Sequence, residues 1–221
     1  MHSLFPNVDW EDMLMATWET VYMTIVSAGA TFVLGLLLGL LLFMTSKDNL
    51  WENKAINALI AAFVNIFRSV PFIILIILLI PFTKALVGTM LGANAALPAL
   101  IIGAAPFYGR MVEIALREID KGVIEASKAM GAKTSTIIFK VLIPESLPAL
   151  ISGITVTTIA LVGYTAMAGV VGAGGLGNLA YMEGFQRSNN DVTLVATVLI
   201  LVMVFVLQFI GDAITSRIDK R

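Results

Sequence analysis

The chain has 221 residues, of which 58% are apolar and 13% are charged, and its 14 basic side chains nearly balance its 15 acidic ones. A nucleic-acid-binding domain would be strongly basic, so this balance excludes one. Cysteine is absent, which excludes disulfides and thiolate chemistry. The single histidine, His2, is close to the N-terminus and cannot anchor a zinc site or a catalytic triad. The apolar residues fall in long uncharged runs, which indicate helices that cross a membrane.

The uncharged runs predict an all-α membrane protein with five transmembrane helices, since a span needs about 20 mostly apolar residues. The second run is interrupted by Arg68 and Pro71, and we interpret it as one kinked helix. The fourth run is longer than one span and predicts a helix to about Val171, followed by a glycine-rich loop. The predicted spans are 20–46, 55–83, 85–109 once its polar start is removed, 146–171 and 192–211.

The residues before the first span are predicted to form an extracellular segment, 1–16. They carry acidic side chains and no Lys or Arg, which is typical of the outer side of a membrane. A cleavable signal peptide would have a basic start and a shorter apolar core, so the sequence predicts a retained helix. The acidic residues ahead of the uncharged run are Asp9, Glu11, Asp12 and Glu19.

Three charged residues follow the third predicted span. Arg110, Glu113 and Arg117 stand at positions i, i+3 and i+7, which lie on one helix face. We expect an ion-paired helix end where the span leaves the membrane.

The loop between the third and fourth spans, about 118–144, is longer than a helix connection requires. Four small or apolar residues recur in it at helical spacing, and Gly131 follows them as a helix stop. A second short helix is predicted after Thr134 or Ser135 as its cap, and Pro144 suits the first turn of the fourth span. The loop is therefore predicted to be a folded two-helix platform; the alternative is an amphipathic connector that lies on the lipid headgroups. The four residues of the first helix face are Val123, Ala126, Ser127 and Met130.

Residues 172–177, Gly-Ala-Gly-Gly-Leu-Gly, match the G-x-G-x-x-G dinucleotide fingerprint letter for letter. No predicted strand precedes them and no βαβ unit surrounds them, so the match does not indicate a nucleotide site. We interpret the segment as a tight turn on the outer side, after the fourth span.

Apart from Arg68 and Arg110, which lie within or at the end of a span, Lys and Arg are strongly segregated, with ten on one side of the predicted membrane and two on the other. Because cytoplasmic loops carry the excess of basic residues, the N-terminus is predicted outside and the C-terminal tail, 216–221, in the cytoplasm. The ten are Lys47, Lys54, Arg117, Lys121, Lys128, Lys133, Lys140, Arg217, Lys220 and Arg221, and the two are Lys84 and Arg187.

The long loop also carries a spaced motif. Glu125-Ala126-Ser127 is followed by three residues, Gly131, nine residues and Val-Leu-Ile-Pro at 141–144. This resembles the EAA loop of ABC importer permeases, which reads EAA, three residues, Gly, nine residues and I-x-L-P; Ser, Val and Ile are mild departures. Three further segments resemble the methionine-uptake permeases of that family, so that the resemblance covers nearly the whole chain. They are 65–72 (Asn-Ile-Phe-Arg-Ser-Val-Pro-Phe), 103–107 (Gly-Ala-Ala-Pro-Phe) and 172–177.

The resemblance implies a type I ABC importer permease fold over 17–215, in a bacterial cell membrane, acting as a homodimer with the substrate pathway at its axis. It implies two copies of a separate ATPase subunit and an extracellular methionine-binding protein as partners. The chain would then be no enzyme and hold no cofactor, since ATP and Mg²⁺ belong to the ATPase; in agreement, it has no G-x-x-x-x-G-K-[ST] phosphate loop. The residues implied in contact with the ATPase are Glu125, Ala126, Ser127, Gly131 and Pro144.

Arg68 is the costliest residue of the chain if it lies deep, at about 2.5 to 3.5 kcal/mol on insertion scales. Pro71 has no N–H for the carbonyl of Phe67, so polar groups or water are expected at this level. Arg68 then pairs with a carboxylate, either of the protein or of a passing amino acid. Alternatively, residues 55–67 lie partly at the cytoplasmic interface and Arg68 extends to the headgroups.

The fourth span supplies further pathway candidates, Thr158, Tyr164 and Met167. Thr158 shares a stripe with Thr155 and Thr165, although membrane threonines often bond instead to the i−4 carbonyl. The flexible thioether of Met167 is a candidate gate, with simple packing as the alternative.

Small residues on the first and fourth spans offer two faces for close packing, and the sequence leaves open which one dimerises. These residues are Gly35 and Gly39, and Gly163, Ala166 and Gly169.

Three alternative functions remain at this point. An ABC importer permease for another small amino acid or peptide would share every feature derived from the residues. An ion-coupled transporter usually has buried acidic or histidine relays, which the centres of spans one, three, four and five lack. A membrane scaffold would bind a cytoplasmic partner without moving a substrate.

Overall fold

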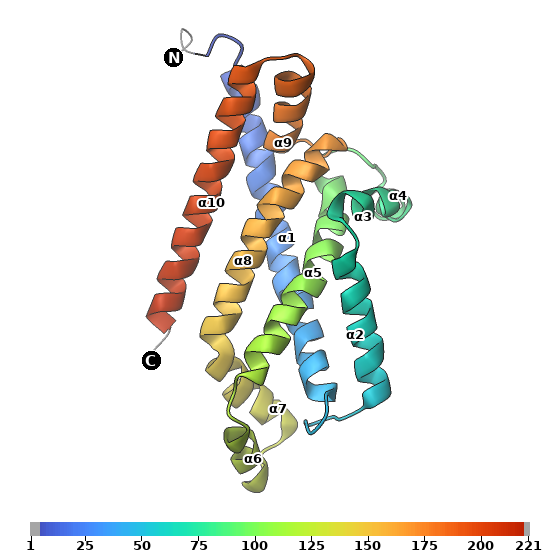
Figure 1. Cartoon of the computed structure of the whole chain (residues 1–221), viewed down its shortest axis with the longest axis vertical. Coiled ribbons are helices and arrows are strands. Elements are labelled where there is room, and N and C mark those ends of the chain that lie inside the picture. The colour runs from blue at the N-terminus through green and yellow to red at the C-terminus, as the bar shows by residue number, and fades with distance from the viewer. Residues whose placement is uncertain (1–4, 219–221) are drawn as a thin grey trace.

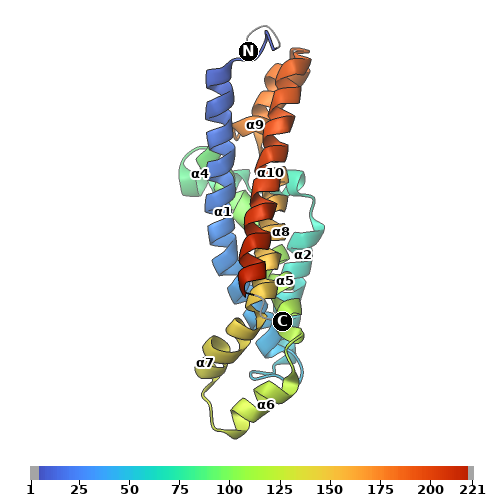
Figure 2. The ribbon, with the colours of Figure 1, turned by 90° about the vertical axis from the view of Figure 1, so that its left-hand side faces the viewer.

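A computed structural model describes residues 5–218, which form a bundle of helices along one long axis with no strand in that range (Figures 1 and 2). His2 and the tail residues 219–221 lie outside the described residues. The helices are α1 (Trp10–Thr45), α2 (Lys54–Ser69), α3 (Phe72–Leu78), α4 (Ile80–Val87), α5 (Ala93–Arg117), α6 (Lys121–Ala129), α7 (Thr134–Ile137), the π-helical turn η1 (Ile138–Leu142), α8 (Ile143–Val170), α9 (Gly175–Leu179), the π-helix η2 (Ala180–Gln186) and α10 (Asn190–Ile218).

Four continuous helical stretches are long and apolar enough to cross a membrane, and a fifth is obtained if α2 and α3 together form one span. The expectation of one kinked helix over 55–83 is wrong, because α2 and α3 meet at 106°. Val70 is extended, with φ −78° and ψ 124°, as the residue before a proline prefers, and Pro71 has no N–H to continue the helix. The chain therefore leaves the direction of α2, and α3 and α4 turn aside from it (Figure 1).

α1 begins earlier than the hydropathy suggested and includes part of the predicted segment 1–16. The Asp9 side chain accepts hydrogen bonds from the backbone N–H groups of Glu11 and Asp12, at 2.9 and 3.3 Å. This N-cap starts the helix at Trp10, ahead of the uncharged run.

α5 lies at the centre of the bundle and packs closely along α1. A Cβ added to Gly35 would lie 2.6 Å from Cδ1 of Tyr108, and one added to Gly39 would overlap Val112. The small-residue face of α1 is thus filled by α5 of the same chain. On α8, Gly169 lies against Gly177 of α9, whereas Gly163 has open space around it.

The predicted platform consists of α6 and α7 at one end of the bundle, here called the loop end (Figure 2). The second helix is not separate as expected, since 134–170 forms one helical stretch through η1 into α8. Lys133 is its N-cap and no side chain caps it, so the expected cap at Thr134 or Ser135 is wrong. Pro144 lies in the first turn of α8, as predicted.

The glycine-rich segment is more ordered than the expected turn. Gly174 and Gly175 have φ of 81° and 78°, and α9 and η2 follow as a helical segment packed beside α10 (Figure 1). The Glu19 carboxylate of α1 accepts from the Gly175 N–H at 2.6 Å, and the Thr20 hydroxyl accepts from the Leu176 N–H at 2.9 Å. Two side chains of α1 therefore cap α9, and sequence reasoning missed both.

Candidate functional site

α6 is a short helix with one face buried and one exposed. Asp120 caps its start by accepting from the Gly122 N–H at 2.8 Å. Ile124 and Ser127 point into the chain, 6% and 7% exposed. Gly131 ends the helix with φ 76°, and its N–H donates to the Lys128 carbonyl at 2.9 Å. The predicted helix stop is therefore a left-handed turn, which glycine adopts most readily.

The opposite face of α6 is free in this chain. Of the predicted face, only Ser127 packs inward, while Val123, Ala126 and Met130 are exposed, and the exposed fraction of Met130 is 79%. Glu125 is exposed beside them. An apolar helix face with a carboxylate, at the tip of the molecule, has the character of a protein-binding surface.

The inner face of α6 ties this surface to the spans. Ile124 belongs to a buried apolar cluster together with Leu116 of α5, Ile137 of α7 and Leu142 of η1. Only residues 118–120 separate α5 from α6, and α7 runs on into α8. α6 is therefore joined to α5 and α8 both by short connections and by packing.

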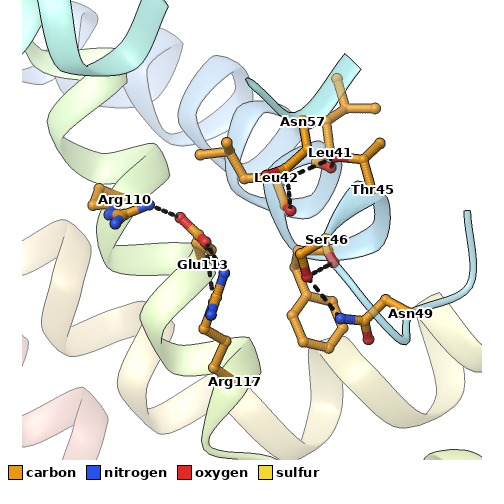
Figure 3. A network of polar contacts seen from close by, with 10 residues as sticks. Leu41, Leu42, Thr45, Ser46, Asn49, Asn57, Arg110, Glu113 and Arg117 are labelled. Carbon is orange, nitrogen blue, oxygen red and sulfur yellow. Dashed lines mark hydrogen bonds and ion pairs between the residues drawn. The ribbon is translucent and has the colours of Figure 1, made fainter. Parts of the chain in front are cut away.

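An ion-paired group fixes the loop end of α5, as predicted. Glu113 is only 2% exposed, and its carboxylate accepts from Arg110 at 2.5 Å and from Nη2 of Arg117 at 2.7 Å (Figure 3). Nearby, the Asn57 amide of α2 donates to the Leu42 carbonyl of α1 at 2.8 Å. The ion pairs therefore stabilise the last turns of α5, and the Asn57 bond joins α2 to α1.

A second candidate site is a cavity of about 230 Å³ at the break between α2 and α3. Arg68 lines the cavity and lies in the last turn of α2. At a rise of 1.5 Å per residue, it is about 21 Å along the helix axis from Lys54, the first residue of α2. The guanidinium carbon lies 5.9 Å from the ring centroid of Phe107, in the middle of α5. The cavity is lined by Phe67, Arg68, Val70, Phe72, Leu75, Gly103, Phe107 and Tyr164.

The predicted pathway residues divide into two groups. Arg68 and Tyr164 both line the cavity, and Pro71 forms the break beside it. Thr158 and Met167 do not line it. The Thr158 hydroxyl donates to the Ile154 carbonyl at 2.8 Å, as the structural alternative proposed.

The other threonines of the stripe also bond to the backbone. Thr155 donates to the Ile151 carbonyl at 2.8 Å and packs against Gly211 of α10, and Thr165 donates to the Val162 carbonyl at 2.7 Å. Met167 lies on the outer face of α8 and is 45% exposed. Sequence reasoning did not identify Phe72 and Phe107 as cavity residues; they come from α3 and α5 and line the cavity together with Arg68 of α2.

The chain matches the family model described as "Binding-protein-dependent transport system inner membrane component" over residues 31–221. It belongs to this family. Membership makes the chain a membrane transport subunit and not an enzyme. The matched range includes the platform helices α6 and α7.

Similar proteins carry more specific names. The chain is 71% identical over 217 residues to the "Methionine import system permease protein MetP" of Bacillus subtilis, covering 98% of both chains. It is 46% identical over 209 residues to the "Probable D-methionine transport system permease protein MetI" of Vibrio cholerae, covering 95% of this chain and 93% of that one.

A solved structure shows the same fold. It is of inward-facing conformations of the MetNI methionine ABC transporter, with a TM-score of 0.94 and 47% identity, covering 96% of this chain and 98% of that one. The fold is therefore the all-α type I ABC importer permease fold that the resemblance implied.

Proposed function

We propose that this chain is the membrane subunit of an ATP-driven importer that moves methionine into the bacterial cell by alternating access. The observation that carries this proposal is the 71% identity, over 98% of both chains, to a protein named as a methionine import permease. The likeness to an inward-facing methionine ABC transporter supports the same reading.

The free face of α6 is the contact with the ATPase subunit, one on each permease of a homodimer. Glu125, Ala126 and Met130 make this contact, while Ser127 and Gly131 hold the helix and its final turn in place. ATP and Mg²⁺ are held by the ATPase. Closure of the ATPase pair moves α6, and the packed cluster around Ile124 passes the movement to α5 and α8.

Pro144 acts at the other end of the platform. It lies in the first turn of α8, directly after the π-helical turn η1, so its missing N–H falls where the helix type changes. Because α7, η1 and α8 form one stretch, α8 tilts with the platform, and Tyr164 and Met167 on it move with respect to the membrane centre.

The loop end faces the cytoplasm and the start of α1 faces outward, where an external binding protein delivers the substrate. The basic residues of the described chain support this orientation, since those of the α1–α2 connection and of α6 to η1 lie at the loop end. Lipid surrounds the apolar outer faces of α1 and α10.

Two features favour ATP-driven transport over the ion-coupled and scaffold alternatives. The buried carboxylate in α5, Glu113, is bonded to two arginines and is not a free proton relay. A scaffold does not need a cavity between its helices, and this chain has one, partly open, beside Arg68.

Substrate identity is tested by uptake into proteoliposomes that contain the chain with its ATPase and loaded binding protein. Labelled L-methionine uptake should be reduced by excess unlabelled L-methionine, and D-methionine is included to define the enantiomer range. Other amino acids and dipeptides in the same excess should leave uptake unchanged. Transport of another solute in preference to methionine would overturn the substrate assignment and leave the permease assignment intact.

A further inference from the structure

We propose that the cavity beside Arg68 is an intramembrane binding site for an amino acid with an apolar side chain, entered after release from the binding protein. This rests on the proposed import function and adds the residues that would hold the substrate within the permease. Arg68 would bind the carboxylate, and the rings around the cavity would hold the side chain.

Arg68 has the charge and the freedom that such a site requires. The ion pairs within residues 5–218 join other residues, and Arg68 has no carboxylate within 4.0 Å. Its neighbour is the ring of Phe107, with 5.9 Å between guanidinium carbon and ring centroid. A guanidinium offers a planar fork of N–H donors that matches a carboxylate in two parallel hydrogen bonds.

The backbone beside Arg68 provides an acceptor for the amino group. Pro71 cannot donate to the carbonyl of Phe67, and the next N–H, that of Val70, donates to the Ile66 carbonyl at 3.2 Å. A break of this kind within a membrane is tolerated where the backbone lines a cavity. In the proposed site the Phe67 carbonyl, which Pro71 leaves without its helical donor, accepts from the amino group while Arg68 binds the carboxylate.

The remaining walls are aromatic or apolar. Phe72 and Tyr164 stack with ring centroids 4.4 Å apart and planes 2° from parallel, which fixes both rings. Gly103 lets Phe72 and Leu75 approach α5, because a Cβ there would be 3.1 and 3.3 Å from their side chains. Thioether sulfur makes favourable contacts with aromatic rings, so these walls suit a methionine side chain.

The volume of the cavity suits a small ligand. At about 230 Å³ it is below the roughly 300 to 1,000 Å³ of sites for drug-sized molecules. A single amino acid fits a volume of this size.

The test is labelling of the purified permease–ATPase complex, without binding protein, by photo-methionine, which carries a diazirine in its side chain. We expect cross-links on peptides containing Phe72, Phe107 or Tyr164, blocked by excess methionine and not by methioninol, which lacks the carboxylate. R68Q should reduce labelling about tenfold to a hundredfold, as expected for loss of hydrogen bonds to a charged group. R68K, which keeps the charge but not the fork, should lie in between, and R187Q, at an exposed arginine outside the cavity, should label like the wild type.

A second variant, F107L, tests the site independently in case R68Q does not fold. F107L keeps the charge and should shift the labelled positions or weaken labelling, while size-exclusion chromatography confirms intact assembly with the ATPase. Labelling confined to other peptides, or unaffected by R68Q and by methioninol, would overturn the site. If wild-type vesicles still import methionine in that case, the import function stands without it.

Discussion

Gly131 is the residue whose backbone defines the end of the α6 surface. Its φ of 76° is in the left-handed region, where a side chain costs about 1 to 2 kcal/mol even though open space surrounds the position. We predict that G131V weakens copurification of the ATPase and lowers the ratio of uptake to ATP hydrolysis. G131N should retain more of both, because asparagine tolerates this conformation. G29A, at an exposed glycine of α1 that also has open space, is the control and should assemble normally.

Glu113 carries the polar connection at the loop end of α5. E113Q removes the charge that both Arg110 and Arg117 contact, and we predict a loss of about 1 to 3 kcal/mol of stability, seen as a lower Tm in detergent. Both arginines are partly exposed and regain water, which keeps the loss below that of a fully buried pair.

The matched control for Glu113 is E183Q. Its carboxylate pairs with the exposed Arg187 near the other end of the bundle, where an ion pair contributes about 0.5 kcal/mol or less. Equal Tm changes for the two variants would contradict the structural role assigned to Glu113.

At the scale of the helices, the contact of α1 with α5 determines where the other spans can pack. Gly39 lies against Val112 and the Gly109 carbonyl, so G39A forces the two helices apart. We predict a cost of about 1 to 3 kcal/mol from overpacking, measured as a reduced Tm and a lower yield of folded protein. G29A, in the same helix with nothing near its Cβ position, should be neutral. A neutral G39A would argue that α1 packs elsewhere.

The sequence predicted the long spans and the position of the platform because both depend on local composition. It did not predict the course of the chain after Pro71. A proline explains why α2 ends, but the 106° turn depends on where α3 finds apolar partners on α5 and α8. The cavity could not be predicted either, because its lining comes from three segments that are far apart in the sequence.

The cap of α9 and the packing partner of the small-residue face of α1 were not predicted, for a related reason. Glu19 caps α9 across 156 positions of sequence, so no local pattern marks the pair. Gly35 and Gly39 gave a correct signal for close packing, but spacing does not state whether the partner is the same chain or a second copy. The hydrogen bonds of the α8 threonines could be predicted, because each hydroxyl donates to a backbone carbonyl four residues earlier in the same helix.

At the scale of the whole molecule, one chain leaves an apolar stripe of α8 uncovered, including Val156, Gly163 and Met167. In the proposed homodimer this stripe faces the axis. The chain has no cysteine, so M167C provides a single reactive position. We predict that a short bismaleimide cross-links M167C into a dimer in membranes.

The control for this cross-link is F209C on α10, which is 75% exposed and faces lipid in the proposed assembly. It should remain monomeric under the same treatment. Cross-linking of F209C without M167C would place the dimer interface on α10 and contradict an axis along α8.

The most direct test of the account is accumulation of labelled methionine in proteoliposomes that contain the permease, its ATPase and the binding protein, with ionophores present to remove ion gradients. We predict that methionine accumulates against its gradient only when hydrolysable ATP is supplied on the side of α6, and that accumulation stops with a non-hydrolysable analogue. Accumulation that requires an ion gradient and continues without ATP, or binding of the ATPase with no flux at all, would contradict it.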